Sequence, residues 1–83
     1  MQYLASIDIM PHKELLDPQG KTVCKNLPNI DINTVADVRI GKHIEMIFEA
    51  ADSEAATELV ETACKKLLAN TIMETYSYHI SQI

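Results

Sequence analysis

Residues 53–69 constrain the fold more than any other part of this sequence, because apolar side chains recur there at the spacing of an amphipathic helix. Acidic residues crowd the first half of this stretch and two lysines lie near its end, as the helix dipole favours. Asp52 or Ser53 can cap its start, and Asn70 is suited to its C-terminal end. The sequence therefore predicts a helix here as its best-defined element.

Alternating apolar residues predict strands before and after this helix. Residues 3–9 alternate as a strand with one buried face does, and Pro11 ends the pairing because it has no amide hydrogen to donate. The same pattern predicts three further strands, within residues 35–40, 44–48 and 72–80. Gly41-Lys42 is short enough to form a hairpin turn between the second and third strands.

A shorter helix is predicted to begin at Asp17-Pro18, since aspartate is a favoured N-cap and proline is favoured at the first helical position. Pro28 and Asn29 stop this helix. Its expected inward stripe consists of Val23, Cys24, Leu27 and Ile30.

The order of these elements, β-α-β-β-α-β, predicts an α+β fold of the ferredoxin-like type within a single domain, residues 1–83. In that arrangement two helices lie on one face of a four-stranded antiparallel sheet. Leu4 and Ile47 are candidates to lie on the opposite face, which no helix covers. An open apolar face usually marks a partner, so we expect the chain to oligomerise through this face or the sheet edges.

Composition excludes several classes of function. The chain has 83 residues and a net charge of −5, and its seven basic residues are not clustered, so neither nucleic acid nor an anionic membrane is an expected partner. The cysteines, Cys24 and Cys64, form no CxxC pair and are expected to be reduced, buried thiols. Without a targeting pattern or a long apolar run, the sequence predicts a soluble, cytoplasmic protein.

Two segments, Leu16-Asp17-Pro18-Gln19-Gly20-Lys21 and Asp37-Val38-Arg39-Ile40-Gly41-Lys42, resemble phosphate-binding sequence, because each places Gly-Lys after an acid. A P-loop needs another glycine five positions before its Gly-Lys, and Leu15 and Ala36 stand there instead. The histidines and serines have no setting that would activate a nucleophile, and no cysteine–histidine spacing suits a metal. We therefore predict no catalytic, cofactor-binding or metal-binding residue in this chain.

Together, these segments carry a resemblance to a known family. The first segment, the run from Val38 to Lys42, and Lys66-Leu67-Leu68-Ala69-Asn70 occur in the order and spacing of the PurS family. Glu74, Tyr76 and Tyr78 resemble the E-x-Y-x-Y ending of that family. The chain departs from the family at Thr71, where many members have proline, and at residues 26–29, where a Leu-Gly turn is more usual.

The resemblance implies a role in the fourth step of de novo purine synthesis. PurS proteins are the small, non-catalytic subunit of phosphoribosylformylglycinamidine synthase, an ATP- and glutamine-dependent amidoligase. The resemblance implies that this chain is a homodimer or homotetramer that bridges the glutaminase and large synthetase subunits and assists ammonia transfer. ATP and magnesium are expected in the synthetase subunit. Whether the chain itself should be called an enzyme stays open.

Partner contacts are expected at the polar ends of the elements, where directional hydrogen bonds can form. The candidate residues are Asp17, Gln19, Lys21, Arg39, Gly41, Lys42 and Asn70. Structural roles compete with partner contact at two of them, because Asp17 can simply cap a helix and Gly41 can simply turn the chain. Arg39 is the strongest candidate, because neither capping nor turning explains its cation.

A small ACT-like module that binds amino acids is the alternative function, since it shares the same order of elements. A ferredoxin-like RNA binder is disfavoured, because the sheet lacks the basic and aromatic residues that such a protein needs.

Overall fold

A computed structural model describes residues 1–13 and 17–83 of the chain. It contains three strands, β1 (Gln2–Pro11), β2 (Lys42–Glu49) and β3 (Glu74–Gln82), and two α-helices, α1 (Pro18–Asn26) and α2 (Ser53–Ala63). A 3₁₀ turn, η1 (Leu27–Ile30), extends α1, and a π-helical turn, η2 (Cys64–Leu68), extends α2. The helix predicted over residues 53–69 is thus confirmed as α2 with η2.

The sheet is antiparallel, with β1 between β2 and β3. In the register, Ala5 lies opposite Met46 on β2 and Ile80 on β3. β1 is the most buried strand, as expected for a central strand with its alternate residues turned inward. Pro11 is its last residue, which confirms that proline ends the pairing.

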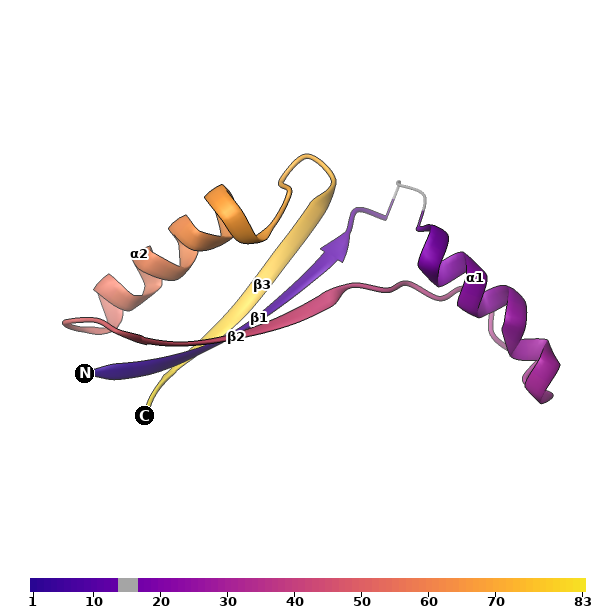
Figure 1. The fold of residues 1–83 in the computed structure, drawn as a ribbon, viewed down its shortest axis with the longest axis horizontal. Helices are drawn as coiled ribbons and strands as arrows, with labels where there is room; N and C mark the ends of the chain where they lie inside the picture. Colours follow the sequence, from indigo (N-terminus) through magenta and orange to yellow (C-terminus); the bar gives the residue numbers. More distant parts are fainter. Residues whose placement is uncertain (14–16) are drawn as a thin grey trace.

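The core lies between the sheet and α2 (Figure 1). Its buried members are Ala5, Ile7, Ile9, Val60, Cys64 and Ala69. The side chains on the other face of the sheet point away from α2, and there Ile47 is 67% exposed opposite Leu4. Among the described residues, neither helix packs against this face, which confirms the prediction that Leu4 and Ile47 lie on a face that no helix covers.

α1 does not cover the sheet. Together with η1 and the returning segment, residues 31–40, it projects beyond the end of β1 (Figure 1). We call residues 17–40 the arm. The arm makes the molecule 51 Å long, and the radius of gyration is 16.5 Å. A compact chain of this length has a radius of about 12 Å, so the fold is extended.

The α+β class is confirmed, and the arrangement is consistent with a ferredoxin-like fold, but the number of strands differs from expectation. The predicted second strand, residues 35–40, has no strand structure. Val35 and Val38 are three positions apart, so they cannot share the face of a strand. The outer edge of β2 is free, but residues 35–40 do not pair with it, and the Ile40 N–H bonds to the Asp17 side chain instead of to a strand.

The expected inward stripe of α1 is wrong at two of its four residues, whereas Cys24 and Leu27 are half-buried. Val23 is 41% exposed and Ile30 is 65% exposed. Gly20 is the buried residue of α1. Of the two free cysteines, Cys64 is buried as predicted, whereas Cys24 on α1 is only half-buried.

No helix in the described ranges is both long enough and apolar enough to cross a membrane.

Candidate functional site

The two segments that resemble phosphate-binding sequence contact each other at the base of the arm. Asp17 caps α1, and its Oδ1 accepts a hydrogen bond from the Gly20 N–H at 3.0 Å. The Oδ2 of the same carboxylate accepts the Ile40 N–H at 2.7 Å. One side chain therefore joins the first turn of the arm to its last residue. We call the residues at this junction, Asp17, Gly20, Val38, Arg39, Ile40 and Gly41, the clasp.

Both glycines of the clasp lie so close to other backbone segments that a side chain would not fit. A Cβ on Gly20 would lie 2.9 Å from the Val38 carbonyl carbon, and one on Gly41 would lie 3.1 Å from the Ile9 carbonyl carbon. Neither glycine has a positive φ. The expected hairpin turn at Gly41-Lys42 is therefore wrong: the chain enters β2 directly, and Gly41 permits close approach to β1.

Arg39 has a structural partner. Its Nη2 donates a hydrogen bond to the carbonyl oxygen of Pro11, the last residue of β1. The backbone hydrogen bonds from Gly20 and Ile40, and secondarily the charge of Arg39, hold the pKa of Asp17 below its ordinary value. Arg39 is the strongest sequence candidate for partner contact because neither capping nor turning explains its cation; the bond to Pro11 gives it a structural role as well, and partner contact through its remaining donors stays a prediction.

Lys42 and Asn70 lie at a second junction, centred on Glu74. Lys42 Nζ is 4.0 Å from Glu74 Oε2, and the Asn70 N–H donates to Glu74 Oε1 at 2.8 Å. The Asn70 side chain also accepts the Ile72 N–H at 3.1 Å. This junction ties the turn before β3 to the start of β2.

The predicted interface residues therefore fall into three places. Asp17, Arg39 and Gly41 belong to the clasp, Lys42 and Asn70 lie around Glu74, and Gln19 and Lys21 are exposed on α1. Leu16 of the first motif lies outside the described residues.

Sequence reasoning missed one cluster that joins α2 to β3. The Tyr76 hydroxyl donates to Glu61 Oε2 at 2.6 Å, and the Tyr78 hydroxyl donates to Glu61 Oε1 at 3.1 Å. The Glu61 carboxylate raises the pKa of Tyr76 to about 12, and these bonds lower the pKa of Glu61. The spacing of the tyrosines showed that they share a strand face, but Glu61 resembled the solvated acids beside it.

We expect Glu61→Gln to lower the pKa of Tyr76 toward its ordinary 10.0, because the carboxylate stabilises the protonated phenol. A titration of phenolate absorbance measures this. Since the pKa of Glu61 is lowered in the fold, its contribution to stability is present above about pH 4.5 and is lost as pH falls through the lowered value. Glu58→Gln, on an exposed residue of the same helix, should leave the tyrosine titration unchanged; a Tyr76 pKa equally high in Glu61→Gln would contradict the assignment.

The clasp has a structural role, because its hydrogen bonds hold the base of the arm against the end of β1. Within the described ranges, no group of three or more His, Cys, Asp or Glu side chains is placed to hold a metal ion.

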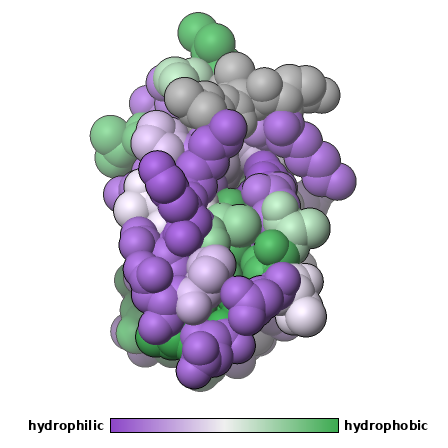
Figure 2. Space-filling view, turned by 90° about the vertical axis from the view of Figure 1, so that its right-hand side faces the viewer, coloured by the Kyte–Doolittle hydropathy of each residue, from purple (hydrophilic) through white to green (hydrophobic). Residues whose placement is uncertain are grey.

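Seen from the arm end, apolar atoms lie at the surface among the polar ones (Figure 2). Val23, Ile30, Ile32 and Val35 are the large apolar residues that the arm exposes.

Comparison with known proteins agrees with this geometry. The family model described as PurS, phosphoribosylformylglycinamidine (FGAM) synthase, matches residues 4–82. The PurS subunit of that synthase from Bacillus subtilis is 38% identical over 81 residues, which are 98% of this chain and 95% of the relative.

Two solved structures share the fold over nearly their whole length. The crystal structure of PurS from Methanocaldococcus jannaschii, a subunit of formylglycinamide ribonucleotide amidotransferase, has a TM-score of 0.86 at 36% identity and covers 98% of both chains. A chain in the structure of PurLQS from Thermotoga maritima has a TM-score of 0.88 at 31% identity, covering 98% of this chain and 99% of that one. The chain belongs to the PurS family, and is a PurS subunit of phosphoribosylformylglycinamidine synthase in purine biosynthesis.

Proposed function

We propose that this chain is a non-catalytic assembly subunit, which bridges the glutaminase and large synthetase subunits of the synthase and assists ammonia transfer between them. The observation that carries the proposal is the arm. It projects from the sheet and exposes apolar side chains that a compact monomer would bury. The likeness to a chain in the PurLQS structure supports an assembly role.

The same surfaces support association between copies of this chain. The arm and the outer face of the sheet expose large apolar residues, including Ile30 at 65% and Ile47 at 67%. We propose a homodimer or homotetramer that covers part of this surface, with the seven interface candidates divided between copies and partner subunits. ATP and magnesium would be bound by the synthetase subunit, and the whole complex would work in the cytoplasm.

Reconstitution tests the proposal. The glutaminase and synthetase subunits are assayed for glutamine-dependent product formation with and without this chain. We expect turnover to depend on this chain, because in the proposed complex it holds the glutaminase and synthetase subunits together. Equal turnover without the chain would refute the proposal.

A matched pair of variants then locates the contact. Ile30→Ser removes an apolar side chain that is 65% exposed on the arm, whereas Ile83→Ser removes one that is 60% exposed at the end of the chain. Both residues are exposed, so neither change should unfold the protein. The arm variant should weaken assembly and turnover, and Ile83→Ser should not.

A further inference from the structure

β2 leaves one backbone edge of the sheet free. It pairs with β1 along one edge, and no described residue pairs with the other. Residues 33–39 form no backbone–backbone hydrogen bond with the described residues. They lead into β2 through Gly41 without a turn, so they cannot lie beside β2 of their own chain. One chain therefore contains a free strand edge, which readily pairs with another segment, and a segment suited to it, but the two do not meet.

The face of the sheet that packs on α2, the inner face, is only partly covered. On β1 the inner side chain of Ile7 is fully buried. On β2 the inner side chains, Ile44, Met46 and Phe48, are only half-buried. α2 packs against β3 instead, and its Glu61 bonds to the tyrosines of that strand. The inner face over β2 therefore lacks the second helix that the order of elements predicts.

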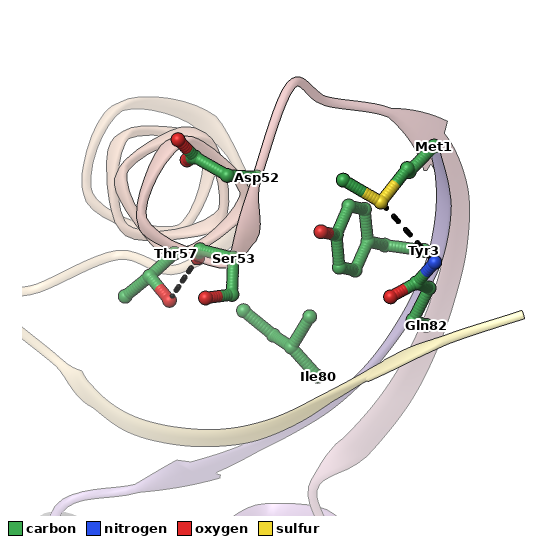
Figure 3. Close-up of a pocket in the computed structure, with 7 residues that line it drawn as sticks. All are labelled: Met1, Tyr3, Asp52, Ser53, Thr57, Ile80 and Gln82. Atoms are coloured by element: carbon green, nitrogen blue, oxygen red, sulfur yellow. Dashed lines mark hydrogen bonds between the residues drawn. The ribbon is translucent and has the colours of Figure 1, made fainter.

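The pocket in Figure 3 is another place that α2 leaves unfilled. Its volume is about 440 Å³, and it lies between the first turn of α2 and the ends of β1 and β3. Tyr3 and Ile80 contribute inner-face side chains to its lining. A single helix is thus too small to cover this face of the sheet.

The arm carries an apolar helical surface that its own chain leaves uncovered. Val23 on α1 is 41% exposed, and Ile30 at the end of η1 is 65% exposed. α1 is the helix that the sequence predicts over the sheet, yet it projects beyond the end of β1 (Figure 1). The uncovered helix and the uncovered inner face over β2 are complementary, but one chain does not bring them together.

The charges of these two surfaces are also complementary. α1 contains Lys21 and Lys25 and no acidic residue. Residues 43–64 contain no lysine or arginine, and they expose Asp52 and Glu54 just after β2. Opposite charges attract partners and fix how they are oriented. α1 of one copy is therefore attracted to the end of β2 in another copy.

We propose that two copies of this chain exchange arms. Residues 33–39 of each copy pair with the outer edge of β2 in the other, and α1 of each copy covers Ile44, Met46 and Phe48 of the other. The paired segments run antiparallel across a two-fold axis, so each arm, which points away from its own sheet, runs back over the sheet of its partner. The exchange rests on the association between copies proposed above and names the contacts that produce it.

Nuclear Overhauser effects in a mixed sample test this exchange. Chains labelled with ¹³C are unfolded and refolded together with unlabelled chains, and effects between the two kinds of chain are selected. We expect such effects between the methyl groups of Val23 or Ile30 in one copy and the Met46 methyl or Phe48 ring in the other. Sedimentation over a range of protein concentrations shows in parallel whether the chain associates.

A matched pair of variants gives a second measurement. Val23→Asp places a charge on the apolar side of α1 and should weaken association about tenfold. Ile83→Asp makes the same kind of change at a side chain that is 60% exposed at the end of the chain, and association should be unchanged.

Two results would overturn the exchange while association between copies still stands. In one, the chain associates but shows no effects between the arm of one copy and the sheet of the other. In the other, Val23→Asp associates as tightly as the unaltered chain. A chain that stays monomeric at every concentration overturns both the exchange and the association on which it rests.

Discussion

Gly20→Ala should destabilise the fold by about 2 kcal/mol and lower the unfolding midpoint by about 10 °C. In an ordinary helix the same change stabilises by up to about 1 kcal/mol, because glycine is a poor helix former. Here a Cβ would collide with the backbone of the returning segment at Val38. A main-chain carbonyl cannot rotate away as a side chain can, so the segment must shift and strain the bond from Ile40 to Asp17.

Lys21→Ala is the matched control, since it makes an exposed change at the next position of the same helix. It should alter stability by less than about 0.5 kcal/mol. Thermal unfolding at one fixed protein concentration compares the variants, because association changes the apparent stability. If Gly20→Ala were as stable as the unaltered chain, the clasp would be open in solution.

The clasp explains why the two segments looked significant before their chemistry could be assigned. The first segment contains an acid that caps a helix and a glycine that permits close backbone approach. The second segment contains another such glycine. Asp17 was predicted as a helix cap, and that part is confirmed. Its second bond, to Ile40, joins residues 23 positions apart. Local propensity carries no information about a contact of that range.

The predicted second strand, residues 35–40, failed for a related reason. Apolar residues in 35–40 suggested a strand, because strands are the usual way to bury such side chains. In the described chain they run back along the arm, where Val35 is 41% exposed. Whether an apolar segment pairs as a strand depends on where the fold places it relative to the sheet edges, and this placement is a property of the whole fold. The long amphipathic helix and the central strand were predictable, because the spacing of apolar residues along each element shows by itself which side chains are buried.

Ile7→Ala should cost about 3 kcal/mol of unfolding free energy, the usual loss when a large aliphatic side chain is truncated in a core. Ile7 is fully buried at the centre of β1, in a core with few large side chains. A domain of this size is stable by about 5–15 kcal/mol, so this change removes a large part of the total. Urea unfolding, with the slope compared between variants, measures the loss.

Ile47→Ala supplies the contrast, because it truncates the same side chain on the outer face of the sheet, where it is 67% exposed. In the single folded chain it should cost less than about 0.5 kcal/mol. If a second copy of the chain covers this face, the variant should still weaken association, which sedimentation over a range of protein concentrations detects. A loss as large as that of Ile7→Ala, and independent of protein concentration, would mean that the chain itself buries Ile47, and would contradict the uncovered face.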